Sequence, residues 1–173
     1  NQNYIIPSQD LYNQVECTQR IIEGYKYLMI IETDQLQKDI YANTILDNFL
    51  NESGLLSLIS NSDFPSRKIA IIYNLLGNIL LEFYENKIEF TQNKLLIVKK
   101  LNLDNDHILD LIYNIFVNGK KYSRNIDFTK ADSYNGMIEV VSRKLARGNL
   151  TNNQELKLKN DIVYYTQKRD EIN

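Results

Sequence analysis

Apolar residues recur at intervals of three and four along most of the chain, which is the spacing of an amphipathic helix. No stretch shows the sustained alternation of apolar and polar residues that is typical of a half-buried strand. The pattern therefore predicts an all-α protein. The apolar stripe of the first predicted helix, over residues 8–31, consists of Leu11, Val15, Ile22, Tyr25 and Met29.

The most apolar segment of the chain is residues 66–85. Between residues 69 and 84 the polar exceptions are Asn74, Asn78 and Glu82, which recur every four residues and so form one narrow polar line on a helix. Such a pattern is typical of a helix with nearly all of its surface covered. We therefore predict that this is the central, nearly buried helix of the fold.

The length of the chain, 173 residues, is usual for one domain. A membrane-spanning helix needs about 20 apolar residues, so the segment at 66–85 is too short and too polar to cross a membrane. We predict a single all-helical domain over residues 1–173. Its expected architecture is a compact bundle of seven or eight helices around the central helix.

Helix boundaries are recognisable in the second half of the chain. Gly119 is expected to end one helix in the left-handed conformation that glycine readily adopts, and Gly148 to end another that begins near residue 133. Thr151 is expected to cap the last helix through its side-chain oxygen. Residues 119–135 are then the longest irregular connection, and loops of that length often carry function.

Charge is divided unevenly along the chain, although the net charge is only −2. Residues 1–86 contain 5 Lys/Arg against 11 Asp/Glu, whereas residues 87–173 contain 15 against 11. Such asymmetry is typical of proteins with charged partners, while two solvated helical surfaces of different charge are the simpler explanation. Arg143, Lys144 and Arg147 fall near the end of a predicted helix, where cations complement its dipole, and we interpret them as structural.

Catalytic and zinc-binding motifs are absent from the sequence. The chain has one cysteine, Cys17, and one histidine, His107, whereas a zinc site needs several such ligands. A Gly-rich phosphate loop, a nucleophile elbow and a Cys/His pair are also missing. We therefore expect no enzymatic activity, no catalytic residue and no cofactor.

A single cysteine favours a cytoplasmic protein, and the start at Asn1 leaves a trimmed N-terminus or a fragment of a longer chain open.

The strongest binding candidate is the predicted loop that begins at Gly119. It places several cations around one aromatic ring, a combination that can contact phosphates and stack on bases. A sequence pI near 5.5 is low for a dedicated nucleic-acid-binding domain, so an ordinary solvated loop or a protein-binding edge is the alternative. The candidate residues are Lys120, Lys121, Tyr122, Arg124 and Lys130.

A second candidate site consists of carboxylates at helical spacing together with the single histidine. Pairs three or four residues apart on facing helices can hold a divalent metal. A solvated helix edge is the alternative, because Asp104 is explained as a helix cap and such pairings are common in a chain with 22 acidic residues. The candidate ligands are Glu82, Glu85, Glu89, Asp104 and His107.

An acidic-ended helix, the link Glu85-Asn86-Lys87-Ile88-Glu89, a predicted helix over residues 91–101 and the segment 101–106 follow one another within residues 82–116. This order resembles the middle of tellurite-resistance B-type helical domains. In that family the link contains Asp-Gly-Lys-Ile followed by Glu, and its acids are associated with metal binding. The resemblance implies a helical fold and a carboxylate metal site in the link.

The function expected from these observations is that of a non-enzymatic module that binds another macromolecule. A protein is the favoured partner, in an adaptor, regulatory, immunity or stress-associated role, because the charge-separated halves and the basic loop offer contact surfaces. Nucleic-acid binding through the basic loop is one alternative. A divalent-metal site built from carboxylates is the other.

Overall fold

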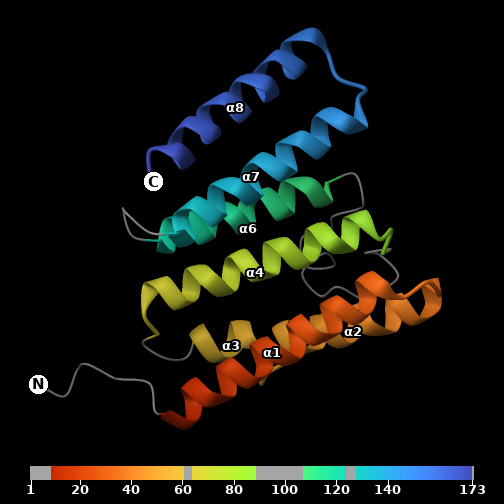
Figure 1. The fold of residues 1–173 in the computed structure, drawn as a ribbon, viewed down its shortest axis with the longest axis vertical. Coiled ribbons are helices and arrows are strands. Elements are labelled where there is room, and N and C mark those ends of the chain that lie inside the picture. Colours follow the sequence, from red (N-terminus) through yellow and green to blue (C-terminus); the bar gives the residue numbers. More distant parts are fainter. Residues whose placement is uncertain (1–8, 61–63, 89–106, 124–127, 173) are drawn as a thin grey trace, which may run out of the picture. The chain divides into compact units, whose positions relative to one another are not determined.

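The computed structural model describes residues 9–60, 64–88, 107–123 and 128–172 of the chain, and this part contains helices and no strand. The all-α class is therefore confirmed for the described residues, and none of their helices is long and apolar enough to span a membrane. The predicted helix over residues 91–101 lies outside them. The helices are α1 (Gln9–Ile31), α2 (Gln35–Leu50), α3 (Leu55–Ser60), α4 (Ser66–Glu85), α6 (Ile108–Tyr122), α7 (Phe128–Arg147) and α8 (Asn152–Asp170) (Figure 1).

The chain divides into two compact units. Unit 1 comprises residues 1–65 and 82–105, and unit 2 comprises residues 66–81 and 106–173. Helix α4 contributes most of its length to unit 2 and its last residues to unit 1. The expectation of one domain over residues 1–173 stays a prediction.

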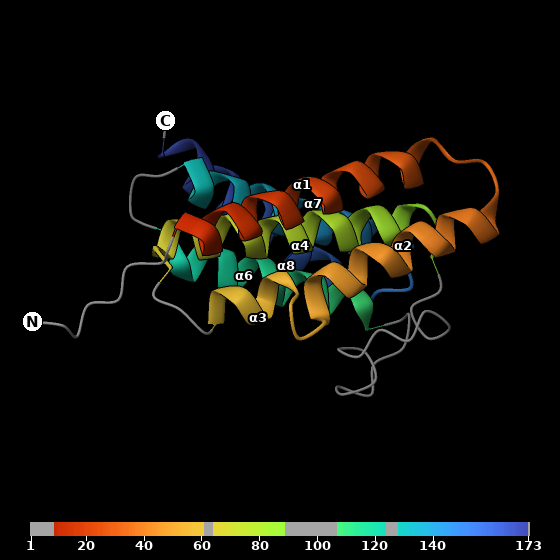
Figure 2. The same ribbon diagram turned by 90° about the horizontal axis from the view of Figure 1, so that it is seen from below.

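Unit 1 is built on the pair α1 and α2, which are joined by a short turn, and α3 packs against both (Figure 1 and Figure 2). The stripe predicted for the first helix is confirmed for Val15, Ile22 and Met29, whose side chains are fully buried, whereas Leu11 and Tyr25 are half-buried. Their spacing of seven residues keeps them on one face of α1. This face supplies the apolar contacts that hold α1 in its unit.

Helix α4 has the bounds that the sequence predicts, Ser66–Glu85. Its polar line is not solvated along its whole length, because Asn74 is buried while Asn78 is exposed. The Asn74 side chain donates to the carbonyl oxygen of Thr129 over 3.0 Å and accepts from the Ser133 hydroxyl over 2.9 Å. Asn74 therefore joins α4 to α7 within unit 2 through a satisfied buried network.

The core of unit 2 is organised around the ring of Phe116, which α6 inserts between two glycines of neighbouring helices. A Cβ atom at Gly77 of α4 would lie 2.6 Å from this ring, and one at Gly136 of α7 would overlap it more severely. Phe116 is fully buried. Neither position can carry a side chain unless the ring moves, so both glycines are required by close packing.

Gly119 does not end a helix, so this prediction is wrong. Helix α6 continues through Gly119 to Tyr122, and a Cβ atom at Gly119 would collide with the side-chain oxygen of Asn74. The glycine is needed for this close approach and not for a left-handed turn. The predicted irregular connection over residues 119–135 is also wrong, because α7 begins at Phe128.

The boundaries predicted between α7 and α8 are confirmed. Gly148 has φ +72, the left-handed conformation that favours glycine. The hydroxyl of Thr151 accepts from the backbone N–H of Gln154 over 3.2 Å, and the Gln154 side chain accepts from the N–H of Thr151 over 2.9 Å. This reciprocal capping box fixes the first turn of α8.

Two glycine substitutions separate packing from helix propensity. Gly136→Ala is expected to destabilise the protein by about 1–3 kcal/mol, because the new methyl group overlaps the Phe116 ring. Gly24→Ala is expected to stabilise it by up to about 1 kcal/mol, because its Cβ meets nothing within 4 Å and alanine favours a helix. Urea unfolding followed by circular dichroism measures both. A stability gain in Gly136→Ala would contradict the packing described for Phe116.

Candidate functional site

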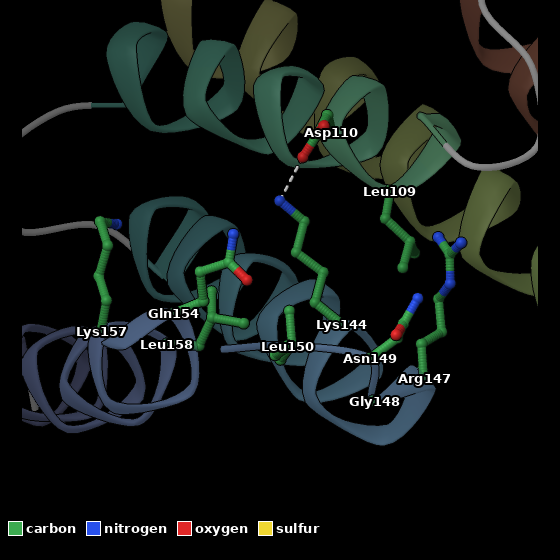
Figure 3. Close-up of a pocket in the computed structure, with 10 residues that line it drawn as sticks. All are labelled: Leu109, Asp110, Lys144, Arg147, Gly148, Asn149, Leu150, Gln154, Lys157 and Leu158. Atoms are coloured by element: carbon green, nitrogen blue, oxygen red, sulfur yellow. Dashed lines mark hydrogen bonds and ion pairs between the residues drawn. The ribbon is translucent and has the colours of Figure 1, made fainter. Parts of the chain in front are cut away.

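A cleft of about 590 Å³ opens in unit 2, where the start of α6, the end of α7 and the start of α8 meet (Figure 3). Its apolar side chains come from α6, from the turn between α7 and α8, and from α8, and its charged side chains are three cations and one carboxylate. The lining residues are Leu109, Asp110, Lys144, Arg147, Gly148, Asn149, Leu150, Gln154, Lys157 and Leu158.

Local sequence places the cations of the cleft. Lys144 and Arg147 are three residues apart in the last turns of α7, so they lie on neighbouring parts of one helix face. The chain then reverses through Gly148 and Asn149, which has φ +60, a conformation that asparagine tolerates better than most residues. The capped first turn of α8 follows and leads to Lys157. A tight turn between two helices therefore gathers the charges.

The carboxylate of the cleft, Asp110, comes from the first turn of α6 and forms an ion pair with the ammonium group of Lys144 (Figure 3). The Asp110 side chain is 58% exposed and that of Lys144 is 27% exposed. An ion pair with this much contact with water contributes at most about 1 kcal/mol. A ligand carboxylate can therefore compete with Asp110 for Lys144.

The lining has an excess of positive charge. It contains three cations and one carboxylate, and Lys157 also pairs over 3.0 Å with Asp161, which lies one turn further along α8. The excess extends to the whole of unit 2, which has 13 Lys/Arg against 9 Asp/Glu, whereas unit 1 has 7 against 13. The charge asymmetry noted along the sequence thus follows the two units, and the cleft lies on the basic one.

Helix α8, which forms one wall of the cleft, is held mainly by polar and aromatic contacts. None of its residues is fully buried. The hydroxyl groups of Tyr113 and Tyr165 share a hydrogen bond, the ring of Tyr165 lies 6.1 Å from that of Tyr134, and Arg169 donates to Asn135 over 2.9 Å. Burial raises the pKa of Tyr165, and the hydrogen bond with Tyr113 raises it further.

Among the described residues of the predicted basic loop, Lys120 and Tyr122 lie against different rings. Lys120 lies 5.7 Å from the centre of the Tyr134 ring on α7, while Tyr122 stacks on Tyr73 of α4 with ring centres 5.7 Å apart. Lys121 is exposed at the end of α6, and Lys130 is half-buried on α7. Arg124 lies outside the described residues. A role of these residues in nucleic-acid binding stays a prediction.

The predicted metal ligands fall in different parts of the chain. Glu82 and Glu85 are at the end of α4 in unit 1, and His107 immediately precedes α6 in unit 2. Glu89 and Asp104 lie outside the described residues. Within the described ranges, no group of three or more His, Cys, Asp or Glu residues is placed to hold a metal ion. The metal site stays a prediction.

Sequence reasoning found two residues of the cleft but gave them another role. The position of Lys144 and Arg147 near a helix end had a sufficient explanation in the helix dipole. The ion-pair partner of Lys144, Asp110, is 34 residues away in the sequence, and only tertiary packing brings it close. The sequence did contain one usable signal. Two cations are followed directly by Gly148 and by a capped helix, an order that indicates a tight, positively charged turn between two helices.

Comparison with known proteins gives no family for this chain. No protein-family model, curated protein or solved structure matches it. The cleft itself is therefore the basis for the function.

Removing one hydroxyl group tests how α8 is attached. The raised pKa of Tyr165 means that its contribution to stability is complete below the ordinary tyrosine pKa of about 10 and is lost as the pH rises above it. Tyr165→Phe is expected to lower stability at neutral pH and to flatten the decline in stability as the pH rises from about 10 to 11. Urea unfolding across this pH range measures the effect. Tyr27, an exposed tyrosine of α1, provides the control. If Tyr27→Phe changed the pH dependence of stability as much as Tyr165→Phe, the effect could not be assigned to the contacts of Tyr165.

Proposed function

We propose that the protein is a non-enzymatic module that binds another protein, in an adaptor, regulatory, immunity or stress-associated role, and that its cleft receives an acidic segment of that partner. The observation that carries the proposal is a concave lining with three cations, one carboxylate and three leucines. A stress-associated role is consistent with the resemblance of residues 82–116 to tellurite-resistance B-type domains.

The leucines of the lining favour a protein segment over a nucleic acid. Leu109 is buried, and Leu150 and Leu158 are half-buried. A nucleic-acid backbone presents phosphates and sugars, which meet the cations but offer no aliphatic side chain to the leucines. A peptide combines one or two carboxylates with apolar side chains, so it matches both the cations and the leucines.

The expected ligand is a segment in which Asp or Glu lies next to an aliphatic or aromatic residue. Its carboxylate would meet Arg147, whose planar guanidinium can donate two parallel hydrogen bonds. Displacement of Asp110 would release Lys144 to a second ligand oxygen. The neighbouring apolar side chain would be covered by Leu150 and Leu158, which adds affinity that does not depend on salt.

Selection of binders from a random peptide library, followed by calorimetry, tests the proposal. The selected peptides are expected to be acidic and apolar. Arg147→Glu is expected to weaken their binding at least about tenfold, because it replaces an attraction with a repulsion. Lys121→Glu makes the same change of charge on an exposed side chain of α6 outside the cleft, and it is expected to change binding less than about twofold.

Three outcomes of this experiment would contradict the proposal: selection of peptides with no acidic bias, equal weakening by Arg147→Glu and Lys121→Glu, or weakening by Lys121→Glu alone. The second would indicate attraction to net charge alone. The third would move the binding surface to the end of α6, where the nucleic-acid alternative is located. Arg147→Gln, which introduces no acid, shows whether Arg147→Glu acts through the loss of the cation or through misfolding.

We also propose that both units form one domain around α4. The shared helix supports this, because α4 supplies residues to each unit. The chain has no tryptophan, so a single Tyr→Trp substitution reports on one unit at a time. Tyr25→Trp in unit 1 and Tyr73→Trp in unit 2 are expected to show the same urea midpoint. Two separate midpoints would mean two domains.

A further inference from the structure

The carboxylate of Asp110 occupies a position in the cleft that an acidic group of a ligand would take. It comes from α6 and forms an ion pair with the ammonium group of Lys144 on α7, and both residues line the cleft (Figure 3). A salt bridge to Lys144 is therefore already made within the chain. A ligand acid that pairs with Lys144 must displace Asp110 first.

A second contact holds the ammonium group of Lys144 beside α6. This group lies 5.7 Å from the centre of the Tyr113 ring, a distance at which a cation and an aromatic ring attract. Asp110 and Tyr113 are three residues apart in α6, so they are neighbours on one helix face. The hydroxyl of Tyr113 shares a hydrogen bond with that of Tyr165 on α8, which fixes the ring. Lys144 is therefore expected to stay in the cleft when its carboxylate partner is removed.

We propose that Asp110 determines the specificity of the cleft, as an internal competitor that favours segments with one acidic residue over segments with several. This inference rests on the proposed function. A first ligand carboxylate meets Arg147 and leaves the pair of Asp110 and Lys144 intact, whereas a second one gains Lys144 only by breaking that pair. Binding sites commonly achieve specificity through such an element, which disfavours the wrong ligand.

The exposure of the ion pair limits the size of the effect. The carboxylate of Asp110 is largely in contact with water, and an ion pair of this kind changes an equilibrium by up to about fivefold. After displacement, the carboxylate remains on α6 in the lining, where it repels the acid that replaced it. The competitor is therefore expected to cancel most of the gain from a second acid without preventing binding of the first.

Unit 2 contains a second ion pair that serves as a matched control. Glu139 pairs with Arg143 one turn along α7, and their side chains are 57% and 25% exposed, close to the values of Asp110 and Lys144. Neither Glu139 nor Arg143 belongs to the residues that line the cleft. Glu139→Gln therefore removes the same charge from a pair of the same exposure, at a position outside the cleft.

Titration by NMR with two synthetic peptides, blocked at both ends, tests the competitor. The peptides Gly-Glu-Leu-Gln-Leu and Gly-Glu-Leu-Glu-Leu differ only in the second acid. The unmodified chain is expected to bind both with dissociation constants within about twofold of each other. Asp110→Asn is expected to bind the two-acid peptide about fivefold more tightly than the unmodified chain does, and the one-acid peptide less than about twofold more tightly. Glu139→Gln is expected to change either dissociation constant less than about twofold.

Two further variants show how Asp110 acts. In a Lys144→Met background, Asp110→Asn is expected to tighten binding of the two-acid peptide less than about twofold, because the cation that the acids compete for is gone. Asp110→Ser also removes the charge and repeats the test with a different side chain. Circular dichroism checks that each variant retains its helices.

The outcomes separate this inference from the proposed function. Binding of the peptides with no gain in Asp110→Asn, or with an equal gain in Glu139→Gln, would overturn the competitor and leave the cleft as a binding site. Weaker binding in Asp110→Asn would also overturn it, because Asp110 would then contact the ligand directly. If neither peptide bound to the unmodified chain or to Asp110→Asn, both the proposed function and the competitor would be contradicted.

Discussion

The ring of Phe116 needs space that only glycine leaves on each side of it, and unit 2 depends on this constraint. The Phe116 ring belongs to α6, and Gly77 and Gly136 allow α4 and α7 to pack closely against it. Gly119 allows the side-chain amide of Asn74 to lie against α6. Close approach in turn allows Asn74 to reach Thr129 and Ser133. A close-packed interior has little room to adjust, so a single added methyl group is expected to disturb several contacts together.

The cleft follows from the same packing. Because α6 and α7 are held closely along their length, the first turn of α6 lies near the last turn of α7, and Asp110 meets Lys144. The turn at Gly148 and Asn149 then returns the chain, and the tyrosine contacts of α8 complete the wall. The cleft, which we propose as a binding site, combines three cations, one carboxylate and three leucines.

Local patterns in the sequence were sufficient to predict much of the fold. The bounds of α4, the buried stripe of α1, and the boundary between α7 and α8 at Gly148 and Thr151 each depend on a few neighbouring residues. Gly119 was misread because a glycine that ends a helix and a glycine that allows close approach look the same without the opposing side chain. The cleft could not be predicted as a site, since Asp110 and Lys144 are brought together by packing between distant segments.

Chemical-shift mapping by NMR, with an acidic and apolar peptide added to the labelled chain, tests the role of the cleft most directly. The account predicts that the largest changes fall on backbone amides of residues 107–111, 143–151 and 154–158, which belong to the three parts of the chain that meet in the cleft. Changes confined to residues 120–122 at the end of α6, or to α1, would contradict it.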